Sequence, residues 1–267
     1  MDSLRGKVVL VTGGASGIGL ATVRLLAEAG SSLAVVDIDE DGAAAAAGEV
    51  GGLAVRADVS EPDEWPRIVA TVTGELGRLD AAHLNAGVTT GVTDITELSD
   101  DAYRRIVGVN QDAVVFGVRA VVPELKKRSG GAIVATASLA GIVAFPLDAA
   151  YTLTKHAVVG LVRALGRVLG SDGITINAVC PGLVDTPLLG GPIREALVDS
   201  GFPLIDARSV AEAVVGCLLG DETGQAIVVQ AGREPIPYRF GRPPGPREAG
   251  AVGKLPPDWI ADPGTTT

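Results

Sequence analysis

The chain has 267 residues with a formal net charge of −10, and 47% of its residues are apolar but only 3% aromatic. This length fits one α/β domain better than two small ones. A core poor in aromatic side chains must be built from Ala, Val, Leu and Ile, as in parallel sheets covered by helices on both faces. The negative charge argues against nucleic acid and anionic membrane surfaces as partners, because no basic surface is left to neutralise phosphates.

Neither a membrane span nor a secretory signal is predicted. No uninterrupted apolar run reaches the roughly 18 residues of a membrane-spanning helix, and the N-terminus lacks a small-residue cleavage site. Cys180 and Cys217 lie in apolar segments and are expected to be reduced, buried residues of a cytoplasmic protein. With only His83 and His156, far apart in the sequence, no metal site is expected.

Short β-branched runs alternate with helical stretches along most of the chain. Seven strands are predicted, at residues 7–12, 32–37, 53–57, 79–84, 132–137, 174–179 and 225–230. Helices are predicted between them, at 17–29, 41–49, 64–76, 99–127 (capped by Ser99), 149–169 and 209–219. The alternation predicts a Rossmann-type α/β fold: a doubly wound, seven-stranded, mostly parallel sheet with helices on both faces.

The composition changes after Gly232. The segment 233–267 contains eight prolines and several glycines. Proline excludes a regular helix or a central strand there. We therefore predict one catalytic domain over residues 1–232, followed by a tail over 233–267 that is either an extended arm or disordered.

A glycine-rich turn, Thr-Gly-Gly-Ala-Ser-Gly-Ile-Gly at residues 12–19, joins the first strand to the first helix. Such a turn lets the backbone approach a pyrophosphate, which the free N–H groups of the helix N-terminus favour. The turn alone is weak evidence, but Asp37 ends the next strand about 20 residues on, as dinucleotide binding requires. Asp37 can accept hydrogen bonds from the adenosine ribose and would repel a 2′-phosphate. Neither the turn nor residues 38–40 offer a basic side chain, so NAD(H) is favoured over NADP(H).

Tyr151 and Lys155 are four residues apart on the predicted helix 149–169, so their side chains project from one face. A free phenol titrates near pH ~10, too high for a useful base at neutral pH. A nearby ammonium group and a positively charged nicotinamide should lower that pKa, so that Tyr151 exchanges a proton with an alcohol or ketone. Ser138 ends its strand at the sheet edge where ligands bind in open α/β folds, and its hydroxyl could hold the substrate oxygen.

These motifs together resemble the short-chain dehydrogenase/reductase family over about residues 5–232. The matching motifs are TGxxxGxG at 12–19, Asn-Ala-Gly at 85–87, Ser138, the Tyr-xxx-Lys of 151–155 and Pro-Gly at 181–182, in the family's order and spacing. The resemblance implies hydride transfer between NAD and an alcohol or ketone, and catalytic roles for Asn110, Ser138, Tyr151 and Lys155. Asn110 would link Lys155 to solvent through water, and Lys155 would also hold the nicotinamide ribose.

The resemblance also implies the cofactor contacts, with Asp58 against the adenine and the loop after residue 180 at the carboxamide end. The implied cofactor-binding residues are Gly13, Ser16, Gly17, Ile18, Gly19, Asp37, Ile38, Asp58, Val59, Asn85, Ala86, Gly87, Tyr151, Lys155, Pro181, Gly182, Val184 and Thr186. Two departures from the family pattern stand out. Leu84 replaces a frequent asparagine, and Gln230-Ala231-Gly232 replaces the usual Asp-Gly-Gly, so subunit contacts of that region are not transferred.

Substrate and assembly are predicted more coarsely. Residues 188–205 would be the family's substrate lid, and Leu139, Val143, Phe145 and Leu147 the opposite wall; both are apolar, which favours a hydrophobic secondary alcohol or ketone. Family members are commonly homotetramers, so a homotetramer, or a homodimer, is expected. Its contacts would use outer helix faces at Val114, Val115, Gly117, Val118, Val158, Val159 and Val162, with monomer core as the alternative. An NADPH-linked 3-ketoacyl-type reductase and a non-catalytic dinucleotide-binding protein stay open as alternative functions.

Overall fold

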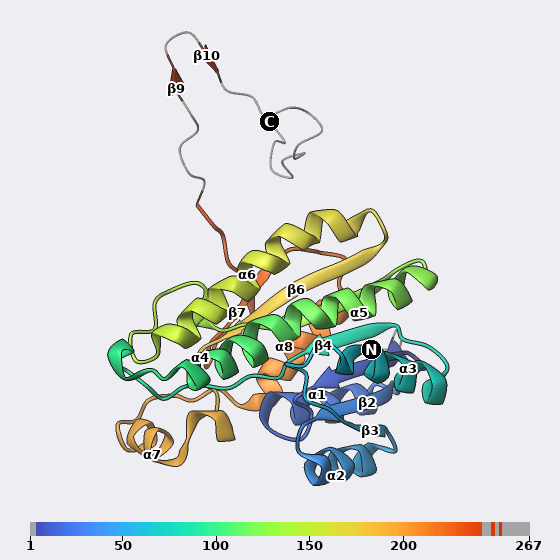
Figure 1. The fold of residues 1–267 in the computed structure, drawn as a ribbon, viewed down its shortest axis with the longest axis horizontal. Coiled ribbons are helices and arrows are strands. Elements are labelled where there is room, and N and C mark those ends of the chain that lie inside the picture. The colour runs from blue at the N-terminus through green and yellow to red at the C-terminus, as the bar shows by residue number, and fades with distance from the viewer. Residues whose placement is uncertain (1–3, 242–246, 249–250, 253–267) are drawn as a thin grey trace.

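A sheet of eight strands runs through the centre of the computed structural model, which describes residues 4–241, 247–248 and 251–252 (Figure 1). The strand order is β3-β2-β1-β4-β5-β6-β7-β8, and all neighbours are parallel except β7 and β8. The strands are β1 (Val8–Thr12), β2 (Ser32–Asp37), β3 (Leu53–Arg56), β4 (Ala81–Leu84), β5 (Gly131–Thr136), β6 (Ile174–Pro181), β7 (Ala226–Val229) and β8 (Ile236–Pro237). The seven predicted strands are confirmed with small shifts at their ends. The eighth strand corrects the predicted count.

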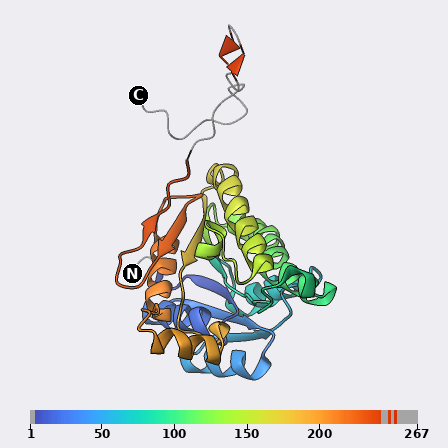
Figure 2. The ribbon, with the colours of Figure 1, turned by 90° about the vertical axis from the view of Figure 1, so that its left-hand side faces the viewer.

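Helices cover both faces of the sheet, as predicted (Figure 2). On one face lie α3 (Glu64–Leu76), α5 (Ala113–Lys127) and α6 (Ala149–Gly170), and on the other α1 (Gly17–Glu28), α2 (Glu40–Val50) and α8 (Ala207–Leu219). Successive strand residues point to opposite faces. Accordingly Val8 and Leu10 belong to one apolar cluster, and Val9 and Val11 to the other. The short helices α4 (Asp100–Val107) and α7 (Gly191–Asp199) follow the carboxyl ends of β4 and β6.

The helix predicted at 99–127 is interrupted. Ser99 caps it as predicted, its hydroxyl accepting from the Ala102 N–H, but a π-helical turn at Gly108–Asp112 separates α4 from α5. The run Asp100–Lys127 is also long and apolar enough to cross a membrane by length and composition, which the sequence prediction did not anticipate. Six residues of α5 are buried in the fold. The core helix of a globular protein satisfies the same length and composition criterion.

The apolar residues predicted to form subunit contacts lie mostly in the monomer core. Val114, Gly117 and Val118 of α5 are buried, as are Val158, Val159 and Val162 of α6. Of the seven, only Val115 is exposed, by 39%. The sequence could not separate the two faces of these helices because both carry small and β-branched residues. The structure therefore favours the alternative, monomer core, for six of them.

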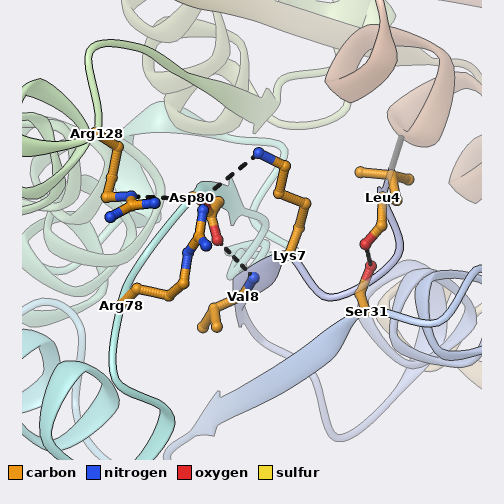
Figure 3. A network of polar contacts seen from close by, with 7 residues as sticks. All are labelled: Leu4, Lys7, Val8, Ser31, Arg78, Asp80 and Arg128. Carbon is orange, nitrogen blue, oxygen red and sulfur yellow. Dashed lines mark hydrogen bonds and ion pairs between the residues drawn. The ribbon is translucent and has the colours of Figure 1, made fainter. Parts of the chain in front are cut away.

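A polar network around Asp80 joins the amino-terminal ends of β1 and β4 (Figure 3). Its carboxylate accepts a 2.9 Å hydrogen bond from the Val8 N–H and is paired with Arg78. Lys7 Nζ and Arg128 Nε lie 3.8 and 4.0 Å from Asp80 Oδ1. Burial opposes ionisation, but the hydrogen bonds from Arg78 and Val8 and the charges of Arg78 and Lys7 prevail, and the pKa of Asp80 is lowered.

The described part of the tail begins as an extended arm along the sheet edge. β8 pairs with β7, and the Tyr238 N–H donates to the Ala226 carbonyl at 2.7 Å. The ring of Phe240 is partly buried, with the Arg163 guanidinium 3.7 Å from its centroid. Further on, β9 (Arg247–Glu248) and β10 (Ala251–Val252) pair with each other. The other residues beyond 241 lie outside the described chain, and the domain boundary at residue 232 stays a prediction.

Candidate active site

The glycine turn between β1 and α1 leaves no room for side chains at two positions. A Cβ at Gly19 would lie 2.0 Å from the Gly13 carbonyl oxygen, and a Cβ at Gly13, whose φ is +63°, would lie 2.9 Å from the Ala86 Cα. Ser16 precedes α1 without a side-chain cap. The first-turn N–H groups of α1, over Gly17–Gly19, are therefore not capped by that side chain. This geometry fits a pyrophosphate at the helix N-terminus.

Asp37 ends β2, and Asp58 lies two residues after the end of β3. Asp37 Oδ2 accepts from the Ala15 N–H at 3.0 Å and Oδ1 from the Asp39 N–H at 3.1 Å, which places the carboxylate against the glycine turn. The neighbouring Ile38 side chain is 59% exposed. Asp58 Oδ1 accepts from both the backbone and the hydroxyl of Ser60. Asp37 and Ile38 thus present a carboxylate and an apolar surface side by side, which suits a ribose and a flat base.

A chain of buried and partly buried hydrogen bonds connects the glycine turn to Asn85, which follows β4, and to Thr136 at the end of β5. Asn85 Nδ2 donates to the carbonyls of Thr12 and Gly13, both at 3.1 Å, and Asn85 Oδ1 accepts from the Thr136 hydroxyl at 3.0 Å. His83 Nε2 lies 2.8 Å from that same hydroxyl. The hydroxyl has one hydrogen, which it gives to Asn85, so His83 Nε2 must be the donor. Burial lowers the pKa of His83 to about 3, so the ring is neutral.

Asn110, on the π-helical turn, holds the loop after β4. Its Oδ1 accepts from the Val88 N–H at 2.8 Å, and its Nδ2 donates to the Val88 carbonyl at 2.9 Å and to the Thr154 hydroxyl at 3.2 Å. A Cβ at Gly87 would lie 3.5 Å from both Asn110 Oδ1 and Lys155 Nζ. The loop therefore passes close to the lysine. The water link predicted for Asn110 stays a prediction, because the bonds of its amide go to Val88 and Thr154.

Tyr151 and Lys155 lie one turn apart on α6, as predicted. Lys155 is buried; its Nζ donates to the Thr136 carbonyl at 2.9 Å and lies 5.5 Å from the centroid of the Tyr151 ring. Ser138 lies close enough to Tyr151 to lower the pKa of its hydroxyl. Of the four predicted catalytic side chains, Ser138, Tyr151 and Lys155 thus lie close together. The fourth, Asn110, contacts the loop after β4, which passes close to Lys155.

The predicted lowering of the tyrosine pKa invoked a bound, positively charged nicotinamide and stays a prediction, while the protein groups alone act in the opposite direction. Burial raises the pKa of Tyr151 to about 12, the neighbouring Ser138 hydroxyl opposes this rise, and the negative charge of Asp148 acts in the same direction as burial. Burial also lowers the pKa of Lys155 to about 8, and at neutral pH the ammonium group is still mostly protonated. The loss of water around both groups disfavours the charged form of each and opposes the effect of a neighbouring positive charge.

One wall of the site is built by the segment between β5 and α6. The Ser138 hydroxyl accepts from the Ala140 N–H at 3.1 Å and so caps a short 3₁₀ turn. The Phe145 ring stands edge-on to Tyr151, with the centroids 6.5 Å apart. Both the N–H and the carbonyl of Phe145 are hydrogen-bonded to the Thr152 hydroxyl at 3.1 Å. This wall is therefore held to the same helix that carries the tyrosine.

The loop after β6 closes the other side. A Cβ at Gly17 would lie 3.1 Å from Thr186 Cγ2, so Thr186 borders the glycine turn. Val184 pairs with Ile205, which closes the base of the predicted lid segment. That segment contains α7, none of whose residues is buried, and Arg194 of α7 forms a two-pronged ion pair with Asp185 at 2.6 and 2.8 Å. Pro181 and Gly182 occupy the carboxyl end of β6, where the Gly182 N–H donates to the Val229 carbonyl.

Sequence reasoning missed three polar residues of this edge: Thr136, His83 and Asp148. Asp148 is buried; its Oδ1 accepts from the Tyr151 N–H and its Oδ2 from the Thr90 N–H, both at 2.8 Å. An aspartate directly before a predicted helix is an N-cap signal that could have identified its first partner. Its second partner is 58 residues away in the sequence, and no local pattern indicates it.

Comparison with known proteins agrees with this geometry. The family model for short chain dehydrogenases matches residues 7–195. The cyclohexanol dehydrogenase of Acinetobacter sp. (strain SE19) is 37% identical over 240 residues, 85% of this chain and 95% of the relative. The 2,5-dichloro-2,5-cyclohexadiene-1,4-diol dehydrogenase of Sphingobium indicum is 36% identical over 192 residues, 71% of this chain and 77% of the relative.

Among solved structures, the 3-ketoacyl-(acyl-carrier-protein) reductase of Brucella melitensis, complexed with NADH, superposes with a TM-score of 0.81 at 31% identity. The match covers 86% of this chain and 99% of that one. The glycine turn, the Ser138–Tyr151–Lys155 cluster and these matches lead to one conclusion: the chain belongs to the short-chain dehydrogenase/reductase family.

Proposed function

We propose that this oxidoreductase is NAD(H)-dependent and interconverts a hydrophobic, ring-bearing secondary alcohol and the corresponding ketone. The observation that carries the proposal is the meeting of Ser138, Tyr151 and Lys155 at the carboxyl edge of the sheet, beside a glycine turn shaped for a dinucleotide. The fold alone would not suffice, because folds of this kind host many functions.

Each of these residues has a task that its surroundings support. When bound, the nicotinamide would accept or supply the hydride. The Ser138 hydroxyl holds the substrate oxygen and Tyr151 Oη takes or gives its proton. Lys155 holds the ribose and lends its positive charge to the phenolate, while Asn110 fixes the loop that passes Lys155. Because burial raises the pKa of Tyr151 to about 12, the tyrosine carries its proton at neutral pH and is poised to donate it to a ketone.

The cofactor would extend from the β2 side of the sheet to the loop after β6. The contacts proposed are Gly13, Ser16, Gly17, Ile18 and Gly19 at the pyrophosphate; Asp37, Ile38, Asp58 and Val59 at the adenosine; and Asn85, Ala86, Gly87, Tyr151, Lys155, Pro181, Gly182, Val184 and Thr186 towards the nicotinamide. NAD(H) is preferred because Asp37 lies against the glycine turn, where a 2′-phosphate would meet its negative charge.

Two observations support a hydrophobic ring-bearing substrate. Exposed apolar side chains occur on both predicted walls, at Val143 and Leu147 on one and at Leu188, Ile193 and Phe202 on the other. In addition, both curated relatives named above are dehydrogenases of ring alcohols by name. A concave site with apolar walls and a few convergent polar groups binds such molecules readily.

A 3-ketoacyl-type reductase remains the second candidate, because the solved neighbour with a TM-score of 0.81 has that activity by name. From the sequence, a 3-ketoacyl-type reductase is expected to use NADPH. Asp37 argues against this class, because its negative charge would repel the 2′-phosphate of NADPH. A non-catalytic dinucleotide-binding role is set aside, since the chain belongs to a dehydrogenase family.

A substrate and cofactor screen tests the proposal. The purified protein is offered cyclic and linear secondary alcohols with NAD⁺ or NADP⁺, and the ketones and an acetoacetyl thioester with NADH or NADPH, while the absorbance of the reduced nicotinamide is followed. We expect turnover of cyclic alcohols with NAD⁺ that Tyr151→Phe abolishes. Turnover confined to the thioester with NADPH would overturn the proposal in favour of the second candidate.

Assembly and location belong to the same proposal. We expect a homotetramer, and the exposed Val115 of α5 and Val168 of α6 offer apolar surface for helix contacts. Light scattering after size exclusion tests this, and a pure monomer would contradict it. A cytoplasmic location is proposed as well, in keeping with two free cysteines, Cys180 and Cys217.

A further inference from the structure

Asp148 joins two segments that face the site from different parts of the chain. One carboxylate oxygen accepts from the Tyr151 N–H in the first turn of α6, and the other accepts from the Thr90 N–H in the loop after β4, both at 2.8 Å. Two residues before Thr90, the side chain of Asn110 is hydrogen-bonded to the N–H and the carbonyl of Val88 in the same loop. The loop that passes Lys155 is thus anchored by Asn110 on one side and by Asp148 on the other.

The burial of this carboxylate is costly. Its residue is only 3% exposed, and within residues 4–241 no cation is paired with it. A buried charge without a counter-ion lowers the folding free energy gained, and its hydrogen bonds and the helix N-terminus offset only part of this cost. Serine or asparagine would cap α6 without this cost. The position therefore carries a requirement beyond helix capping.

The requirement follows from the two donors. Thr90 and Tyr151 both point an N–H at position 148, so the side chain there must accept twice. A carboxylate has two acceptor oxygens, whereas an asparagine amide would turn its own N–H₂ towards one of the donors, and a serine would reach only one. Aspartate is the short side chain that satisfies both.

We propose that Asp148 is a positioning residue for the reaction: its carboxylate clamps the loop after β4 to the first turn of α6 and thereby fixes Tyr151 relative to Lys155 and the cofactor-side loop. The inference rests on the proposed function, because it concerns the same tyrosine. Asp148 acts through the backbone of Tyr151 and the charge it brings, and it needs no contact with substrate or cofactor.

The charge of Asp148 gives this role a signature of its own. The groups facing Tyr151 are Lys155 and Asp148 at α6, Ser138 after β5 and the Cys180 thiol of β6. Burial raises the pKa of Tyr151, the Ser138 hydroxyl lowers it, and Asp148 and Cys180 add to the rise. Removing the charge of Asp148 should therefore move the pH at which Tyr151 loses its proton downwards, whereas loss of a neutral cap would not.

The test compares Asp148→Ser and Asp148→Asn with the wild type in alcohol oxidation. Asp148→Ser keeps a capping oxygen for the Tyr151 N–H, so α6 is retained while the charge and the bond to Thr90 are lost. We expect kcat to fall about tenfold or more, because small misplacements of a reacting group are costly. NADH affinity, measured by fluorescence titration, should stay within about twofold of wild type, since Asp148 is not among the proposed cofactor contacts. The acidic limb of the kcat profile should move to lower pH in both variants.

Asp206→Asn is the matched control. Asp206 caps α8 through the Arg208 N–H and is exposed, so this variant also loses a capping carboxylate. A pH profile that stays at the wild-type position in both Asp148 variants, with kcat reduced no more than in Asp206→Asn, would overturn the inference. If the wild type itself turns over no alcohol or ketone, the proposed function fails instead, so the two failures are distinct.

Discussion

Two buried aspartates at opposite edges of the same sheet are neutralised in different ways. At the amino-terminal edge Asp80 has Lys7, Arg78 and Arg128 around it as well as the Val8 N–H. At the carboxyl edge the carboxylate of Asp148 is also buried, and within residues 4–241 its hydrogen bonds come from the N–H groups of Thr90 and Tyr151 alone. The two sites differ in how the negative charge is balanced. At Asp80 the neighbouring cations neutralise the charge of the carboxylate, whereas the charge of Asp148 acts on the neighbouring Tyr151.

We expect Asp80 to contribute to the stability of the fold and Asp148 to the reaction. Asp80 ties β1 to β4 far from the glycine turn, so its surroundings can be arranged for folding alone. Asp148 lies beside a group that must exchange a proton, and a cation there would cancel the charge that raises the pKa of Tyr151. Changes at the two edges should therefore affect different quantities, catalytic rate at one and free energy of unfolding at the other.

The largest effect is expected at the carboxyl edge. Tyr151→Phe removes the proton-exchanging hydroxyl and should lower kcat by about 10²–10⁴, the usual contribution of a general acid or base. Both the free energy of unfolding and NADH binding should stay close to wild type. Steady-state kinetics and fluorescence titration check this, and a variant that keeps most of its turnover would refute the role of Tyr151.

The matching change at the amino edge is Asp80→Asn. It leaves the partly exposed Lys7, Arg78 and Arg128 without their shared anion and weakens the acceptor of the Val8 N–H. Loss of these charge-assisted hydrogen bonds costs about 1.5–3 kcal/mol of unfolding free energy. Activity per folded molecule should not change. Urea unfolding measures the loss. The comparison breaks down if Asp80→Asn lowers kcat as strongly as Asp148→Ser does.

The pH dependence of Asp80 follows from the direction of its pKa. Because the folded-state pKa is lowered, Asp80 contributes stability that is present above its unfolded pKa, about 4, and is lost as the pH falls through the lower folded value. Below about pH 4 the unfolding free energy of the wild type should therefore fall more steeply with pH than that of Asp80→Asn. At neutral pH the two proteins should have the same slope of unfolding free energy against pH, although the wild type remains more stable. Acid titration of the urea midpoint in both proteins tests the sign.

A third buried group, His83, takes part in no ion pair within residues 4–241 and stays neutral. Burial lowers its pKa to about 3, below the value of about 6.5 in the unfolded chain. The stability that it contributes is thus complete above pH 6.5 and is lost as the pH falls towards 3, at up to about 1.4 kcal/mol per unit. His83→Gln, which keeps a donor for Thr136, should flatten the loss between pH 6.5 and 5. The exposed His156→Gln serves as control, and equal slopes in wild type and His83→Gln would contradict the assignment.

The sequence predicted the parts of this molecule that local patterns encode. Strand alternation, the glycine turn with Asp37 after β2 and the one-turn spacing of Tyr151 and Lys155 are all readable from neighbouring residues. The π-helical turn at Gly108–Asp112 was not predicted, because the apolar spacing runs through it without a break. Nor was the partnership of Asp148 with Thr90, which depends on packing between distant segments. The burial of Tyr151, which raises its pKa, is likewise a tertiary property that no local pattern encodes.

The smallest effect expected concerns an aspartate that is partly exposed to solvent. Asp37 accepts from the N–H groups of Ala15 and Asp39 at the sheet edge where the adenosine is proposed to bind. Asp37→Ala should raise the KM for NAD⁺ about tenfold, which corresponds to about 1.4 kcal/mol of binding free energy. It should also reduce the discrimination against NADP⁺, because the charge that repels the 2′-phosphate is gone. Its kcat at saturating NAD⁺ should remain near wild type, since Tyr151 and Lys155 are untouched. Unchanged KM values for both cofactors would remove Asp37 from the site and with it the preference for NAD(H).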